Sequence, residues 1–88
     1  VKMRIVVVYK DYSDHGREVR EYIEDFERQT GLKVEVMDPD SGRNEFFLRA
    51  YDVVEYPTIL AITDEGCLLQ QWRGKPLPLF DEVAYYAR

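Results

Sequence analysis

A proline directly before an apolar run is the feature of this sequence that most constrains its fold. The stretch from Tyr51 to Thr58 ends in Pro57-Thr58 and leads at once into Ile59-Leu60-Ala61-Ile62, a run typical of a β-strand. Proline has no N–H to donate to a sheet ladder, so it belongs at the first residue of a strand or just before it. We therefore expect a strand that begins at Thr58, with Pro57 setting the angle at which the chain enters it.

The first half of the sequence predicts two strands with a helix between them. The apolar, β-branched run from Arg4 to Tyr9 predicts a central strand, and the alternating stretch from Lys33 to Met37 predicts a strand nearer an edge. Between them, apolar spacing predicts an amphipathic helix that begins at Ser13 or Asp14 as its N-cap and ends at Gly31. The apolar face of that helix consists of Val19, Tyr22, Ile23 and Phe26.

The second half adds two helices and a hairpin. A turn at 38–42 precedes a short helix, and the strand from Thr58 turns at Asp64-Glu65-Gly66 into an antiparallel partner at the sheet's edge, from Cys67 to Trp72. A C-terminal helix is expected just after Pro78. The order β-α-β-α-β-β-α predicts one α/β domain over residues 1–88, with a four-stranded mixed sheet and helices on both faces. The apolar positions of the short helix are Phe46, Phe47, Ala50 and Tyr51.

Composition argues against several classes of function. The net charge of -5, from 17 acidic and 12 basic residues, argues against a nucleic-acid surface, because phosphate binding needs clustered Lys and Arg. The longest apolar run, from Ile5 to Tyr9, is too short to span a membrane, and the charged start 1–4 lacks the apolar region of a secretory signal. We therefore expect a cytoplasmic location and neither nucleic acid nor membrane as a partner. The sequence does not indicate an oligomeric state.

Three segments resemble the thioredoxin and glutaredoxin-like family. The pattern Tyr-x-Val-x-x-x-Pro-Thr from Tyr51 to Thr58 resembles the family's cis-proline segment, and the hairpin leading to Trp72-Arg73-Gly74 resembles its closing hairpin. The stretch from Val8 to Arg17 resembles the pattern aromatic-x-x-aromatic-Cys-x-x-Cys-Lys, and Asp38 falls where the family has an acidic residue ending a strand. The resemblance implies a minimal thioredoxin fold with a cis peptide bond before Pro57.

The two cysteine positions of that pattern are occupied by Ser13 and Gly16. Dithiol exchange needs a thiolate and a second thiol to resolve the mixed disulfide, and the chain has a single cysteine, Cys67, expected to be half-buried. We therefore expect a redox-inactive domain with no catalytic residues and no cofactor. On this register, cysteines placed at both positions should lie on the first helical turn and oxidise to a disulfide.

Other chemistry near these positions is weakly indicated. His15 lies only two residues from Ser13 on the same turn, which does not suit a Ser-His-Asp arrangement. His15 with Asp11 and Asp14 could suggest a metal site, but a metal would need a third or fourth well-placed ligand. No metal site is predicted.

The resemblance implies a groove beside Pro57 in which an extended partner peptide lies, with Tyr12 and Tyr56 flanking it outside the core. We therefore predict a protein- or peptide-binding module, with anionic or peptide ligands collecting at the start of the first helix. One alternative is a glutathione- or thiol-binding domain, similar to that of the glutathione transferases, that uses the hydroxyl of Tyr12 or Ser13. Another is a purely structural or assembly protein. The candidate binding residues are Tyr12, Ser13, Asp14, His15, Gly16, Tyr56, Pro57 and Thr58.

Overall fold

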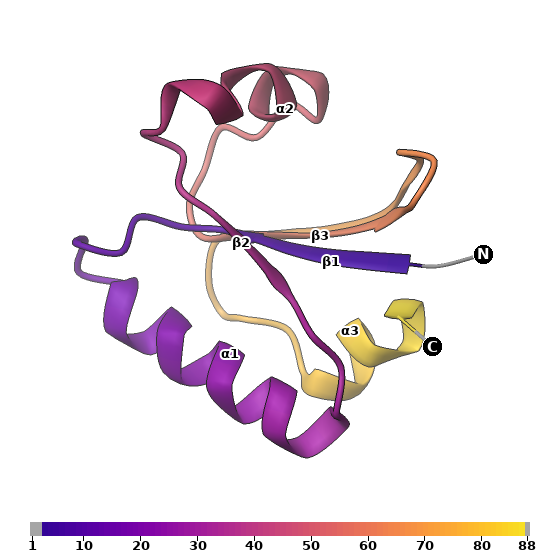
Figure 1. Ribbon diagram of the computed structural model, residues 1–88. Coiled ribbons are helices and arrows are strands. Elements are labelled where there is room, and N and C mark those ends of the chain that lie inside the picture. The colour runs from indigo at the N-terminus through magenta and orange to yellow at the C-terminus, as the bar shows by residue number, and fades with distance from the viewer. Residues whose placement is uncertain (1–2, 88) are drawn as a thin grey trace.

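A computed structural model describes residues 3–87 of the chain, which alternate strands and helices as the sequence predicts (Figure 1). Among these residues, no helix is both long and apolar enough to cross a bilayer. The elements follow in the order β1 (Met3–Val8), α1 (Gly16–Thr30), β2 (Glu35–Met37), the 3-10 turn η1 (Gly42–Asn44), α2 (Glu45–Ala50), β3 (Thr58–Thr63), β4 (Leu68–Arg73) and α3 (Phe80–Ala87).

The four strands form one mixed sheet in the order β2-β1-β3-β4. Strand β1 runs parallel to β2 and antiparallel to β3, and β3 runs antiparallel to β4. This arrangement confirms the predicted α/β architecture, with the first strand central and the strand ending at Met37 at an edge. Because Val8 pairs with both Met37 and Thr58, the chain leaves β1 and β2 and enters β3 at one end of the sheet.

Alternating residues of β1 face two different helical layers. Ile5 and Val7 point to the face covered by α1 and α3, whereas Val6 and Val8 point to the face covered by α2. Figure 1 shows α1 and α3 on one side of the sheet and α2 on the other. The continuous apolar run therefore reflects a strand buried on both faces.

A bidentate ion pair links the short edge strand β2 to β1. The guanidinium of Arg4 donates from Nε and Nη2 to the two carboxylate oxygens of Glu35, each at 2.7 Å. This hydrogen bonding holds the pKa of the Glu35 carboxyl below its usual value. The pair reinforces the parallel alignment that brings the end of β2 beside the end of β1.

Helix α1 begins later than the sequence predicts. Its N-cap is His15, and no side chain caps it, so the prediction of Ser13 or Asp14 as N-cap is wrong. The Ser13 hydroxyl donates instead to the carbonyl of Lys10 at 2.6 Å, because the chain makes a separate turn before the helix starts. The predicted end is confirmed: Gly31 has a φ of 75° and donates its N–H to the Glu27 carbonyl at 2.9 Å.

Helix α2 presents a narrower apolar face than its spacing predicts. Phe47, together with Leu48 and Tyr51, packs against the core beneath the helix. Phe46 is 84% exposed, and Ala50, four residues later on the same stripe, is exposed as well. The predicted apolar face is therefore only partly right, because a helix of six residues covers the sheet with one stripe.

The hairpin between β3 and β4 turns as expected at Gly66, whose φ is 96°. Cys67 lies in this turn, and its backbone N–H and carbonyl pair with Thr63. Its side chain is exposed, so the prediction of a half-buried cysteine within the returning strand is wrong. Strand β4 begins one residue later, at Leu68.

Tyr22 joins α1 to the segment that precedes α3. Its hydroxyl donates to the Pro78 carbonyl at 2.7 Å, and its ring meets the Phe80 ring edge-on at 5.0 Å between centroids. Burial, with a smaller contribution from the charge of Glu82, raises the pKa of Tyr22 to about 12. The folded protein therefore favours the protonated phenol.

Alkaline titration should reveal this preference. The pKa of Tyr22 is higher in the folded protein than its unfolded value of about 10, so the protonated phenol stabilises the fold. This contribution to the free energy of unfolding is complete below pH 10 and is lost as the pH rises from about 10 to about 12. We expect Tyr22→Phe to lower the free energy of unfolding by about 1 kcal/mol at neutral pH, because the hydrogen bond to Pro78 is missing. Between about pH 10 and pH 12, the variant should lose less stability than the original protein. Urea unfolding of both proteins at several pH values measures this. An equal alkaline loss in the variant would contradict the assignment.

Candidate binding site beside Pro57

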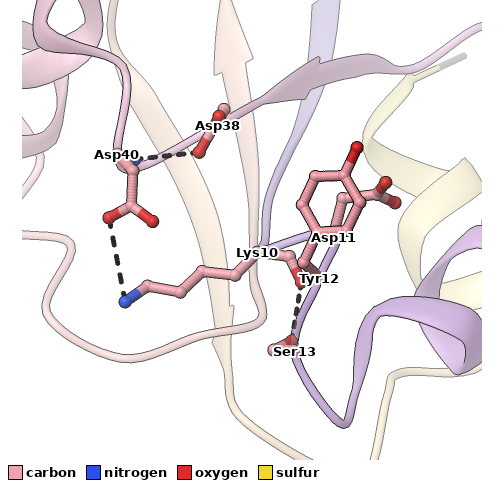
Figure 2. Close-up of a pocket in the computed structure, with 6 residues that line it drawn as sticks. All are labelled: Lys10, Asp11, Tyr12, Ser13, Asp38 and Asp40. Atoms are coloured by element: carbon pink, nitrogen blue, oxygen red, sulfur yellow. Dashed lines mark hydrogen bonds and ion pairs between the residues drawn. The ribbon is translucent and has the colours of Figure 1, made fainter.

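A cavity of about 210 Å³ opens at the end of the sheet where β1 and β2 finish. Figure 2 shows its lining, which comes from the segment after β1 and from the segment after β2. Ligands of open α/β sheets bind outside the carboxyl ends of the strands, and this cavity occupies such a place. The residues that line it are Lys10, Asp11, Tyr12, Ser13, Asp38 and Asp40.

Backbone and side-chain hydrogen bonds hold the loop between β1 and α1 in one conformation. Ser13 donates both its N–H and its hydroxyl to the Lys10 carbonyl, at 3.1 and 2.6 Å. The Lys10 N–H donates to Nε2 of His15 at 3.2 Å, so this imidazole nitrogen acts as an acceptor. The hydroxyl proton of Ser13 is therefore already donated to a backbone carbonyl. This argues against the alternative in which the Ser13 hydroxyl stabilises a bound thiolate.

Gly16 is enclosed by the same loop. A Cβ at this position would lie 2.1 Å from the carbonyl oxygen of Asp11 and 2.8 Å from its carbonyl carbon. These are backbone atoms, so the loop itself would have to move to admit any side chain. Ser13 precedes the helix, so the expectation that positions 13 and 16 share its first turn is wrong. The enclosure of Gly16 also opposes the predicted disulfide, because a second cysteine has no room in this loop conformation.

Carboxylates outnumber cations around the cavity. Asp11 pairs with Arg20 of α1 and accepts a hydrogen bond from the Tyr9 hydroxyl at 3.4 Å. Asp40 lies 3.8 Å from Nζ of Lys10 and donates its N–H to Asp38 at 2.9 Å. The three carboxylates of Asp11, Asp38 and Asp40 thus have two cationic partners, Lys10 and Arg20, which leaves a net negative charge. This charge opposes the expectation of an anionic ligand and favours a cationic or neutral group.

Lys10 links this cavity to the proline segment. Its ammonium lies 5.5 Å from the centroid of the Tyr56 ring, within the range of a cation–π contact. Tyr56 is half-buried against the core beneath α2, so the expectation that it stands outside the core is wrong. Tyr12, by contrast, is fully exposed, at 101% of its reference area.

The peptide bond between Tyr56 and Pro57 is cis, and so is the bond between Lys75 and Pro76. The side chains of Pro57 and Thr58 are buried, and the Thr58 hydroxyl donates to the Glu55 carbonyl at 2.6 Å. Within residues 3–87, the backbone N–H and carbonyl of Tyr56 make no hydrogen bond. The Tyr56 backbone therefore keeps its hydrogen-bonding capacity for a partner, whereas the Pro57 carbonyl accepts the Gly74 N–H at 2.7 Å.

The predicted site residues fall into different roles. Tyr12 and Ser13 line the cavity, whereas His15 and Gly16 shape the loop behind it and Asp14 is exposed. The sequence prediction of binding residues missed four lining residues: Lys10, Asp11, Asp38 and Asp40. Their common signal is their position just after the carboxyl ends of two parallel strands.

Acidic residues at this end of the sheet do not form a metal centre. Among residues 3–87, no group of three or more His, Cys, Asp and Glu side chains is arranged to hold a metal ion. The carboxylates of Asp11 and Asp40 instead pair with Arg20 and Lys10.

Comparison with known proteins identifies the fold. No family model matches the chain, and no curated protein matches it in sequence. Among solved structures, a mutant thioredoxin from Halobacterium salinarum has a TM-score of 0.79 at 22% identity, covering 99% of this chain and 76% of that one.

Two further structures agree. Fasciola hepatica thioredoxin has a TM-score of 0.69 at 20% identity, covering 83% of this chain and 68% of that one. Thioredoxin 1 from Thermosipho africanus has a TM-score of 0.65 at 17% identity, covering 94% of this chain and 88% of that one. These likenesses, together with the sheet order β2-β1-β3-β4, establish that the chain has the thioredoxin fold.

Proposed function

We propose that this domain binds an extended segment of a partner protein beside Pro57 and performs no dithiol chemistry. The observation that carries the proposal is the backbone of Tyr56, which is unpaired within the described part of the chain, and the Tyr56 ring lies 5.5 Å from the ammonium of Lys10. Lys10 in turn lines a cavity that can receive a side chain. An extended peptide gains affinity from main-chain hydrogen bonds and specificity from pockets for its side chains. The excess of carboxylates in the cavity suits a basic or neutral residue of that peptide.

The position of Cys67 supports the absence of dithiol chemistry. Thr63 pairs with Met3 of β1 and is hydrogen-bonded to Cys67, so this cysteine lies near the amino end of β1. Ser13 follows the carboxyl end of the same strand. The two ends of a six-residue strand lie about 16 Å apart, so this thiol cannot act at the cavity.

Truncating Tyr12 tests the surface. Tyr12→Ala should weaken binding of a partner captured from a lysate by about 1 to 2 kcal/mol, because a rigid aromatic side chain anchors a peptide at low entropic cost. Calorimetric titration measures the change, and the fold should be unaffected because the side chain is fully exposed. Phe46→Ala, which removes another exposed aromatic ring from a different surface, is the matched control and should leave the affinity unchanged.

Amide chemical-shift mapping with the same partner locates the contact independently. Shifts should gather at Tyr12, Ser13, Asp40 and Tyr56. Shifts confined to the turn at 64–67 or to α3 would show that the partner uses another surface and that the proposal is wrong.

A further inference from the structure

A second cavity, of about 220 Å³, lies between the edge strand β4 and helix α3. Helix α3 packs against β1 and β3, so β4 extends past it and leaves a hollow on that face of the sheet. The residues that line the hollow are Gln70, Trp72, Glu82, Tyr85 and Tyr86. None of them belongs to the site beside Pro57.

Three of the five lining side chains are aromatic, and their rings stand at steep angles to one another. The Tyr86 ring meets Trp72 at 5.7 Å and 69°, and it meets Tyr85 at 5.1 Å and 87°. Trp72 and Tyr86 also pack against the core, which fixes their positions. Tyr85 is 74% exposed, so its ring contributes little to the core and is available to a ligand.

Among residues 3–87, Glu82 is the one charged residue that lines this cavity. Glu82 accepts the Leu79 N–H on Oε1 at 3.1 Å, and within residues 3–87 it forms no ion pair. Its second oxygen remains for a ligand. The basic residue nearest in sequence, Arg73 of β4, donates to Gln71 and points to the opposite face of the sheet. Aromatic faces beside a carboxylate attract an ammonium or guanidinium group.

The edge of β4 offers backbone groups beside the same cavity. Strand β4 ends the sheet order, so its outer side has no strand partner among the described residues. The Gln71 N–H on this side donates to the Gln70 side chain at 2.9 Å, a bond that an added strand would replace. An extended segment can add to such an edge, and every second side chain of that segment then points to the face on which Gln70 and Trp72 lie.

We propose that this aromatic cavity binds the lysine or arginine side chain of an extended basic segment of another protein, which pairs with the free edge of β4. The main chain of the segment extends the sheet. The cationic side chain contacts Trp72, Tyr85 and Tyr86 and is neutralised by Glu82. This site is separate from the one beside Pro57 and does not depend on it.

Trp72 is the only tryptophan of the chain, so its fluorescence reports on the cavity directly. The probe is a short synthetic peptide of alternating threonine and lysine, and the matched peptide carries glutamine in place of lysine. We expect the lysine peptide to change Trp72 fluorescence saturably, with amide shifts at Gln70 to Trp72 and at Glu82 to Tyr86. The glutamine peptide should bind several-fold more weakly.

Two variants test the chemistry with little effect on the fold. Tyr85→Leu removes an exposed ring and should weaken the lysine peptide by about two- to fivefold, the range of a cation–π contact at an exposed site. Glu82→Gln can still accept the Leu79 N–H. It should weaken binding of the lysine peptide by a similar factor, and the remaining binding should depend less on salt. Tyr12→Leu, at the other site, should change nothing.

Several results would overturn the proposal. Equal binding of the two peptides, no change in Trp72 fluorescence at millimolar peptide, or unchanged binding by Tyr85→Leu would each exclude a cation site. Fluorescence that depends on protein concentration without peptide would show that a second copy of the chain occupies the edge instead.

Discussion

Gly16→Ala is expected to lower the free energy of unfolding by about 3 kcal/mol, a large effect for the addition of one methyl group. The added Cβ would lie 2.1 Å from the Asp11 carbonyl oxygen, well inside van der Waals contact. Because the obstruction is backbone, no change of rotamer relieves it. The loop from Lys10 to Ser13 would have to move, and it would strain the hydrogen bonds that Ser13 and His15 make to Lys10.

Gly42→Ala is the matched control for this prediction. A Cβ at Gly42 would meet no atom within 4 Å, and its φ is not positive. We expect the control to change stability by less than about 0.5 kcal/mol. Urea unfolding of both variants gives the comparison. Equal stabilities would mean that the loop opens freely and that Gly16 is not enclosed.

The enclosure of Gly16 connects the absence of a side chain at this position with the shape of the site. A residue with a side chain at this position would require another path for the loop between β1 and α1. The present path places Lys10, Asp11, Tyr12 and Ser13 on one wall of the cavity. The cavity is therefore built on a loop whose present path leaves no room for a side chain at position 16.

The architecture could be predicted because burial leaves a strong periodic signal. The run from Arg4 to Tyr9 is apolar on both faces because helices cover both faces of β1. Pro57 before an apolar run predicted the start of β3 at Thr58, and Gly31 predicted the end of α1. Each of these features follows from the backbone and the burial of one segment.

The details that sequence reasoning missed depend on contacts between distant segments. Ser13 was expected to cap α1, but its hydroxyl bonds to Lys10 because the loop turns before the helix starts. Asp38 and Asp40 reach the cavity only because β2 pairs with β1 in parallel register. The aromatic cavity likewise joins β4 to α3 and leaves no local pattern in the sequence.

Phe26→Ala is expected to lower the free energy of unfolding by about 3 to 5 kcal/mol. The side chain is 1% exposed, and its ring lies 6.4 Å from that of Tyr22 and 5.6 Å from that of Phe80. Removing it would leave a cavity between α1 and α3. A domain of this size has a total stability of about 4 to 13 kcal/mol, so the loss would be a large part of the whole.

Phe46→Ala makes the same chemical change at a position that is 84% exposed, and it should cost less than about 0.5 kcal/mol. Chemical unfolding of the two variants therefore measures the effect of burial, because both make the same Phe→Ala change. The sequence pattern placed Phe26 and Phe46 alike on apolar helical faces, and only their neighbours distinguish them. Similar losses in the two variants would mean that the face of α2 bearing Phe46 is covered in solution, whereas a small loss for Phe26 would mean that α1 does not pack on α3 as described.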